Sequence, residues 1–183
     1  MDCTKCNTKS CRSTEPCHAQ KFDAEELKVT YHLPENMKII QAALQLVDNG
    51  RAGTLSRLQE IIEFSKSLNF QRIGVAYCYG MENDAAIITA IFRESGFKVF
   101  PVSCTTGGFK QSEVNTRSKI GKVSCNPLAQ AGQLNHESVD LTMTVGLCLG
   151  HDILFNKHIK SYTTTLIVKD RVHNHNPGDA LKN

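Results

Sequence analysis

Four of the eight cysteines lie within the first seventeen residues, at a spacing that suits metal ligands. The run is Cys3-x2-Cys6-x4-Cys11-x5-Cys17. The first two cysteines can occupy two corners of a tetrahedron, and the other two lie within reach of the remaining corners. Zinc would fold such a segment outright, and an iron–sulfur cluster suits the compact spacing equally well. His18 could replace one cysteine, and a disordered or disulfide-linked tail is the alternative interpretation.

The other four cysteines are spread through the rest of the chain, three of them at the ends of strand-like segments. Cys78, Cys104 and Cys148 end short apolar runs, and Cys125 stands directly before a helix start at Asn126-Pro127. Ligands of parallel sheets bind at the carboxyl ends of the strands, so these sulfurs are expected to converge. Three or four thiolates around one pocket suit a [4Fe–4S] cluster, with zinc as the second choice. Alternatively, each cysteine is a small buried hydrophobic residue.

Helix starts and glycines beside these cysteines favour thiolates. Unpaired N–H groups and the positive end of the helix dipole stabilise a thiolate at a helix start, as expected for Cys125 and Cys148. Glycines let the backbone approach a bulky cofactor closely, and Gly107 and Gly108 follow Cys104 in this way. The expected cofactor-binding residues are Cys104, Cys125, Cys148, Gly107 and Gly108. Cys78 is expected to be a fourth ligand or a free nucleophile.

Two histidines lie near the same predicted edge of the sheet. His151 follows Cys148 closely, and His175 lies in a polar segment after the last predicted strand. We expect His151 or His175 to act as a proton donor, the alternatives being a polar helix start and a polar turn. The nearby Lys169-Asp-Arg171 could bind an anionic substrate, with a surface ion pair as the alternative.

The elements that must position these residues alternate between strand and helix. Apolar runs predict strands over residues 72–78, 98–104, 141–148 and 163–169, with helices between them. Pro101 favours an edge position for the second strand. The alternation predicts an α/β fold, a small Rossmann-like parallel sheet of about four strands with helices on both faces. We expect a cysteine-rich metal-binding segment over residues 1–35 and an α/β domain over residues 36–183.

Composition limits the class of protein. The chain has 183 residues, 40% hydrophobic and 21% charged, with a net charge of +3. That charge implies no nucleic-acid partner, and no apolar run is long enough to predict a membrane span. We therefore expect a cytoplasmic protein whose partner is a small-molecule substrate or an electron-transfer partner. In a reducing compartment, clustered cysteines are metal ligands or reactive thiols more often than disulfides.

Several motifs together resemble the bacterial and archaeal proteins grouped as domain of unknown function 1847. They are the N-terminal CxxCxxxxC, Gly-Val-Ala-Tyr-Cys78-Tyr-Gly, Cys104 with Gly107-Gly108, Cys125-Asn-Pro-Leu-Ala-Gln-Ala, Gly-Leu-Cys148-Leu-Gly-His-Asp and Val-Lys-Asp-Arg-Val172 with His175-Asn-Pro. The resemblance covers nearly the whole chain. It implies metal binding without a known reaction. The ligands it implies are Cys3, Cys6, Cys11, Cys78, Cys104, Cys125 and Cys148.

Two functional hypotheses follow from these observations. The first is an α/β protein with an iron–sulfur centre at the carboxyl edge of its sheet and a second metal site in the N-terminal segment. Its role would be redox or sulfur chemistry on a small molecule, as in an iron–sulfur-dependent oxidoreductase or a sulfur-handling enzyme. The second is a non-enzymatic module that binds zinc or senses metal or redox state.

Overall fold

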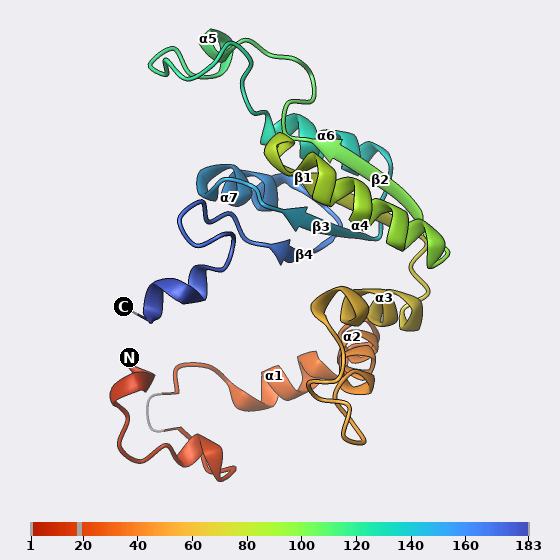
Figure 1. Ribbon diagram of the computed structural model, residues 1–183. Coiled ribbons are helices and arrows are strands. Elements are labelled where there is room, and N and C mark those ends of the chain that lie inside the picture. Colours follow the sequence, from red (N-terminus) through yellow and green to blue (C-terminus); the bar gives the residue numbers. More distant parts are fainter. Residues whose placement is uncertain (1, 18–19, 183) are drawn as a thin grey trace. The chain divides into compact units, whose positions relative to one another are not determined.

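The computed structural model describes residues 2–17 and 20–182, and the chain falls into two compact units, 1–44 and 45–183 (Figure 1). His18, considered above as a ligand, lies outside the described residues. The first unit contains two short 3-10 helices and two α-helices, which are η1 (Cys3–Lys5), η2 (Ser10–Arg12), α1 (Ala24–Tyr31) and α2 (Pro34–Gln45). None of its described residues before Ala42 is buried. Hydrophobic burial within this unit therefore contributes little to holding the first 35 residues in place.

The second unit holds the strands together with most of the helices. Its strands are β1 (Arg72–Tyr77), β2 (Lys98–Ser103), β3 (Leu141–Val145) and β4 (Tyr162–Ile167). Its helices are α3 (Arg57–Ser67), η3 (Tyr79–Met81), α4 (Glu82–Glu94), α5 (Gln111–Val114), α6 (Pro127–His136), α7 (Leu149–His158) and η4 (Pro177–Leu181). Among the described residues, none of the helices combines the length and apolar character needed to cross a bilayer.

The four strands form one parallel sheet in the order β2-β1-β3-β4. This confirms the predicted α/β fold, and Pro101 lies on an edge strand, as expected. In doubly wound sheets of this order the direction of winding reverses beside the first strand, here between β1 and β3. Ligands of such sheets bind beyond the carboxyl ends of the strands at that point.

Two hydrophobic clusters cover the two faces of the sheet. One joins Ile73 and Val75 of β1 to Phe92 of α4. The other joins Ala76 of β1 to Leu134 of α6. Because successive strand residues point to opposite faces, the helices lie on both faces, as predicted. Figure 1 shows α4 in front of the strands in this view.

A glycine ends β3 earlier than the sequence suggests. The predicted strand ran to Cys148, but Gly146 takes a left-handed conformation with φ +61° and turns the chain away from the sheet. A β-carbon at Gly146 would overlap the Met81 sulfur. The packing beneath η3 therefore leaves no room for a side chain at this position.

Replacing Gly146 with alanine is expected to destabilise the α/β unit by roughly 3 kcal/mol or more, because it adds a steric overlap to backbone strain. Denaturant unfolding measures the change. Gly150→Ala in α7 is the matched control, since a β-carbon there meets no atom within 4 Å. The control is expected to be neutral or to stabilise the helix by up to about 1 kcal/mol. Equal stability of the two variants would contradict the packing described above.

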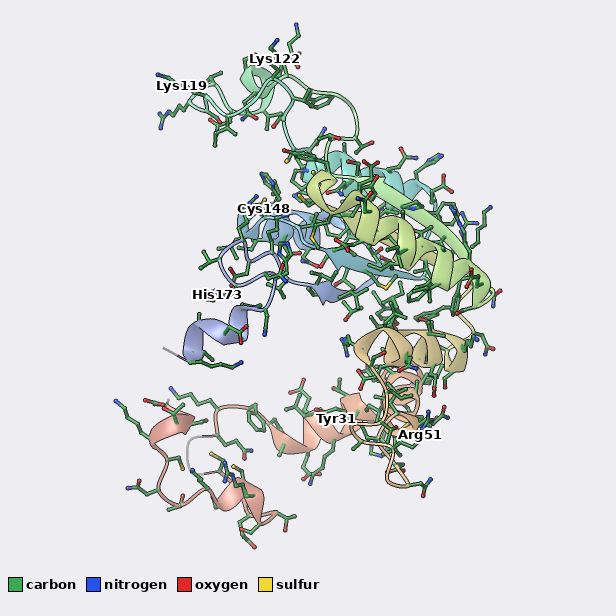
Figure 2. The ribbon with its side chains drawn as sticks, viewed as in Figure 1. Tyr31, Arg51, Lys119, Lys122, Cys148 and His173 are labelled. Carbon is green, nitrogen blue, oxygen red and sulfur yellow. The ribbon has the colours of Figure 1, made fainter. Side chains whose placement is uncertain are left out.

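A long loop between β2 and α6 carries α5 and returns Cys125 to the sheet. Lys110 and Val123 form an antiparallel bridge at its base, and the Ser124 N–H donates to the Phe109 carbonyl at 2.9 Å. Figures 1 and 2 show the loop projecting from the sheet, with Lys119 and Lys122 on its outer part. The bridge brings the end of the loop back beside its beginning.

Candidate functional site

Three of the cysteines meet at the carboxyl edge of the sheet. Cys78 directly follows β1, Cys104 directly follows β2, and Cys125 ends the long loop. The sulfur of Cys104 lies 3.6 Å from the sulfur of Cys125. Cys78 lies next to Cys104, because Tyr77 and Ser103 are paired at the ends of β1 and β2. Cys78 and Cys104 are buried, and Cys125 is half-buried. We call Cys78, Cys104 and Cys125 the thiol cluster.

Backbone hydrogen bonds fix the thiol cluster to the sheet. The Cys78 N–H donates to the Val145 carbonyl at 3.0 Å, which ties it to β3. The Cys104 N–H donates to the Tyr77 carbonyl at 2.9 Å, and the Asn126 N–H donates to the Cys104 carbonyl at 2.6 Å. The strand ends and the start of α6 therefore hold the three sulfurs together.

Gln130 of α6 is hydrogen bonded to the ends of the same strands. Its side chain is fully buried, and its Nε2 donates to the carbonyls of Tyr77 at 3.1 Å and Val102 at 2.8 Å. Carbonyls at the ends of β1 and β2 thus have a side-chain donor in place of water. Gln130 is a positioning residue that sequence reasoning missed, because a polar residue within a helical pattern gives no sign of being buried.

Within the thiol cluster, the pKa values of Cys78 and Cys104 are shifted in opposite directions. The Cys104 thiol donates to Cys78, and with the Gly80 N–H and the Lys169 ammonium it lowers the pKa of Cys78 to about 5, against the effect of burial. The Lys169 Nζ lies 3.4 Å from the Cys78 sulfur. The same bond to Cys78, together with burial, raises the pKa of Cys104, although the Tyr79 N–H donates to its sulfur at 3.3 Å. The pair therefore favours a single negative charge, and the Lys169 ammonium beside Cys78 stabilises that charge on Cys78.

Cys148 has a different partner. It caps the N-terminus of α7, and its sulfur accepts a hydrogen bond from the Arg171 guanidinium at 3.3 Å. This bond raises the pKa of Arg171. Figure 2 labels Cys148 near the start of α7. Within the described residues, the sulfur of Cys148 contacts a cation and no second sulfur.

Lys169 and Arg171 contribute charge to the site. Among the described residues neither of them forms an ion pair with a carboxylate, and each donates to a cysteine sulfur. The surface ion pair considered from the sequence is therefore not the observed arrangement. Cations next to sulfur favour thiolates, which are the reactive and metal-binding form of cysteine.

The two predicted proton donors occupy different environments. His151 lies partly exposed in the first turn of α7, and its imidazole makes no hydrogen bond within the described residues. His175 closes a turn, because its Nδ1 accepts from the Asp170 N–H at 3.1 Å and its own N–H donates to the Asp170 carbonyl at 2.7 Å. His173 donates its backbone N–H to Asp170, which is the largest factor that lowers the pKa of this carboxyl. Figure 2 labels His173 in this tail.

Gly107 and Gly108 bring the loop backbone close to the start of α6. Both have positive φ, and a β-carbon at Gly107 would lie 3.3 Å from the Asn126 Nδ2. That nitrogen is buried and has no acceptor among the described residues, while the Asn126 Oδ1 accepts from the Ala129 N–H. An unsatisfied buried donor next to Cys125 suits a bound group that carries an acceptor atom, such as a metal-bound sulfur.

The sulfur spacing can be compared with known metal geometries. Two sulfurs at about 2.3 Å from one tetrahedral zinc are about 3.8 Å apart, close to the 3.6 Å between Cys104 and Cys125. In a [4Fe–4S] cluster each cysteine binds a different iron, so these sulfurs would have to move apart. Among residues 2–17 and 20–182, no group of three or more His, Cys, Asp or Glu is placed so that it could hold a metal ion. At the thiol cluster, the separation between the sulfurs of Cys104 and Cys125 matches ligand spacing.

The N-terminal cysteines are more exposed. Cys3 and Cys11 are exposed, and Cys6 and Cys17 are half-buried. The Lys9 N–H donates to the Cys6 sulfur at 3.4 Å, and this bond is the main factor that lowers the pKa of Cys6. All four are free thiols, and in the part of the chain that the structure describes they form no group of three that could hold a metal ion.

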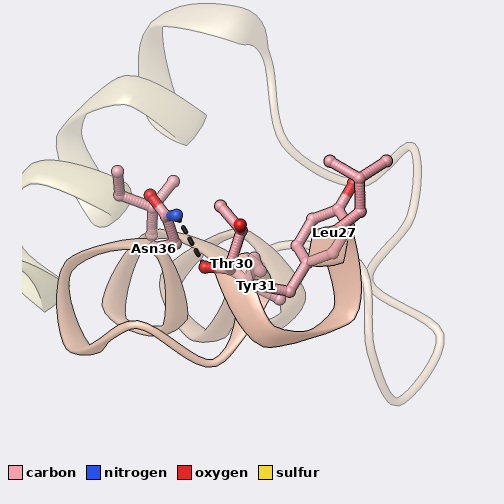
Figure 3. Close-up of a pocket in the computed structure, with 6 residues that line it drawn as sticks. Leu27, Thr30, Tyr31 and Asn36 are labelled. Carbon is pink, nitrogen blue, oxygen red and sulfur yellow. Dashed lines mark hydrogen bonds between the residues drawn. The ribbon is translucent and has the colours of Figure 1, made fainter. Parts of the chain in front are cut away.

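The first unit also contains an apolar pocket of about 300 Å³. It is lined by Leu27, Thr30, Tyr31, Asn36, Ile39 and Ile40 (Figure 3). The Asn36 Nδ2 donates to the Thr30 carbonyl at 2.8 Å. The lining contains no cysteine, histidine or carboxylate, so this pocket supplies no metal ligand of its own.

Comparison with known proteins places the chain in a family. A family model described as "Protein of unknown function (DUF1847)" matches residues 15–166. The chain belongs to this family. An uncharacterised protein of Methanocaldococcus jannaschii is 39% identical over 186 residues, which cover 99% of this chain and 93% of that protein. No solved structure matches the chain.

The match to DUF1847 confirms the predicted resemblance. It spans the thiol cluster and Cys148, whereas Cys3, Cys6 and Cys11 precede the matched residues and Lys169 follows them. The family's description names no reaction, so the chemistry of this member must be argued from its own geometry.

Proposed function

We propose that the thiol cluster is a metal–thiolate centre that performs redox or sulfur chemistry on a small molecule. The observation that supports this most strongly is the 3.6 Å between the sulfurs of Cys104 and Cys125, with Cys78 at the end of the paired strand β1. Lys169 supplies a positive charge to the same cluster. A bound metal would supply Lewis-acid or electron-transfer chemistry at this edge.

The sulfur spacing bears on which metal is bound. A single tetrahedral ion, either zinc or iron, requires the least movement of Cys104 and Cys125. A [4Fe–4S] cluster is the alternative and would require the long loop to carry Cys125 away from Cys104. Because Cys148 contacts Arg171, three cysteines would hold the ion and one coordination position would stay open to substrate.

Hydrogen bonds to sulfur support the same proposal. The N–H groups of Tyr79 and Gly80 point at the sulfurs of Cys104 and Cys78, and Lys169 adds a charged donor. Several thiolates on one ion carry excess negative charge, which such donors offset. A reducing cytoplasm, where we place the protein, would keep all eight cysteines in the free form seen here.

A second candidate function is a non-enzymatic redox-sensing module. The 3.6 Å between the sulfurs of Cys104 and Cys125 favours it. Their oxidation would form one S–S bond and release two protons, with two electrons passing to an external oxidant such as a disulfide. In this case the thiolate of Cys78 would be poised to attack the new bond at Cys104.

Metal analysis after anaerobic purification tests the first proposal against the second. One zinc or iron per chain in excess of the N-terminal site, lost in Cys125→Ser, is expected for a mononuclear centre. Iron and inorganic sulfide in equal amounts, with broad visible absorption, would identify a cluster instead. Two results together would favour the redox sensor. One is an unchanged metal content in Cys125→Ser, and the other is a reversible Cys104–Cys125 disulfide in the native chain.

We further propose a second metal site, most simply zinc, in the N-terminal segment. The four candidate ligands are Cys3, Cys6, Cys11 and Cys17. None of the described residues of this unit before Ala42 is buried, so a bound ion would supply the order that a hydrophobic core does not. The N–H···S bond from Lys9 to Cys6 supports this assignment.

Removing that metal is expected to expose the N-terminal segment to trypsin. Lys5, Lys9 and Arg12 are exposed, and we expect cleavage after them to become about tenfold faster when a chelator unfolds the segment. Mass spectrometry of the fragments over time measures the rates. Cleavage after Lys119 in the projecting loop is the internal control and should not change. Equal N-terminal rates with and without chelator would contradict the site.

A further inference from the structure

A cavity of about 100 Å³ lies at the carboxyl ends of β3 and β4. Its polar lining consists of Thr144, Asp152, Thr165 and Lys169, and its apolar walls include Leu147 and Ile167. At about 30 Å³ per water molecule, this volume holds roughly three waters, or a ligand of a few non-hydrogen atoms.

An irregularity in the sheet lies beside this cavity. Thr144 pairs with Thr165, but Val145 pairs with Ile167, so one residue of β4 is left without a partner. Such a bulge increases the local twist and disrupts the ladder. The first turn of α7 then places Asp152 over the opening.

The Asp152 carboxylate has no ion-pair partner among the described residues. It accepts from the Asn156 Nδ2 at 3.1 Å. The nearby Thr144 hydroxyl donates to Thr165 at 3.2 Å. Burial raises the pKa of Asp152. No ion pair to this carboxyl forms among residues 2–17 and 20–182. A ligand ammonium would supply the missing positive charge.

Lys169 connects the cavity to the thiol cluster. It lines the cavity while its Nζ donates to the Cys78 sulfur at 3.4 Å. An ammonium group carries three donors, so one bond to sulfur leaves two for a ligand. The cavity thus contains a carboxylate, on Asp152, that can accept a further hydrogen bond. It also contains an ammonium group, on Lys169, that can donate further hydrogen bonds.

We propose that this cavity binds a small zwitterion of the amino-acid class, with its ammonium on Asp152 and its carboxylate on Lys169. The inference rests on the proposed function, because Lys169 would hold the ligand next to the thiol cluster. The small volume and the apolar walls admit a short aliphatic side chain and exclude a long or charged one.

Calorimetric titration of the full chain with three probes tests this assignment. L-alanine carries both charges, propanoate lacks the ammonium, and ethylamine lacks the carboxylate. We expect L-alanine to bind at least about tenfold more tightly than either of the others, since each loses one charge-assisted hydrogen bond. Asp152→Asn should weaken L-alanine by about tenfold and leave propanoate unchanged. Asp179→Asn, in the exposed C-terminal η4, is the matched control and should change nothing.

The inference is wrong if L-alanine does not bind, if all three probes bind equally, or if Asp152→Asn binds L-alanine as tightly as the native chain. Thermal unfolding of Asp152→Asn checks that the variant is folded. Metal content of the same samples separates the two proposals. Metal retained without L-alanine binding contradicts the zwitterion site alone. L-alanine binding in a chain whose thiol cluster takes no metal contradicts the metal centre alone.

Discussion

Replacing Cys104 with serine is expected to weaken metal binding at the sheet edge by a hundredfold or more. Cys104 is the central member of the thiol cluster, 3.6 Å from the Cys125 sulfur and next to Cys78 at paired strand ends. Loss of a residue that only orients a ligand lowers metal affinity by about 10- to 100-fold, and loss of a ligand should exceed that range. Competition with a chromophoric chelator measures the affinity.

Cys148→Ser is the matched control for this experiment. Its sulfur contacts Arg171 and no second sulfur within the described part of the chain, so its loss should change metal affinity much less. The sequence alone favoured Cys148 as a ligand equal to the others. Equal losses in the two variants would support that four-cysteine site and contradict the three-cysteine arrangement.

The second large effect concerns the charge of Cys78 in the metal-free protein. Its pKa is lowered to about 5 from an ordinary value of 9.0, so the thiolate should persist down to about pH 5 and be lost below it. The change in ultraviolet thiolate absorbance between the native chain and Cys78→Ser, followed across pH, measures the midpoint. Lys169→Met removes a charged donor and should raise the midpoint by about one unit.

Lys182→Met serves as the control for Lys169→Met, because Lys182 is exposed and pairs with Asp179. Its midpoint should equal that of the native chain. A midpoint above pH 8 in the native chain would show that Cys78 is an ordinary buried thiol. That result would remove the electrostatic support for the proposed centre.

The strands of this protein were predictable because their apolar runs are short and bounded by glycines and charges. Cys78 and Cys104 could be placed at one edge from the sequence, since parallel strands share the direction of their ends. The end of β3 was not predictable, because an apolar run through Gly146 gives no sign of its left-handed turn. Helix α1 was not predicted, because its sequence has no clear hydrophobic face. Asp23 and Glu26 do form a pattern typical of a helix start.

The partners of the sulfurs were less predictable than the sulfurs themselves. Lys169 and Arg171 lie beyond the last strand, and only the folded tail brings their charges to Cys78 and Cys148. From the sequence, Gln130 is an ordinary polar residue of a helix, and only the folded structure shows that it is buried. From the sequence, Asp152 is a polar residue at a helix start, and its place in the lining of a cavity depends on the fold. These contacts depend on tertiary structure, which local pattern does not encode.

Cobalt spectroscopy on a chain whose four N-terminal cysteines are replaced by serine tests the central claim most directly. This variant leaves the thiol cluster as the intended site, and the visible bands of bound cobalt report tetrahedral thiolate coordination. We expect one cobalt per chain, with intense tetrahedral and thiolate charge-transfer bands that Cys104→Ser abolishes. Weak octahedral bands, or tetrahedral bands that survive Cys104→Ser, would contradict a metal–thiolate centre at Cys78, Cys104 and Cys125.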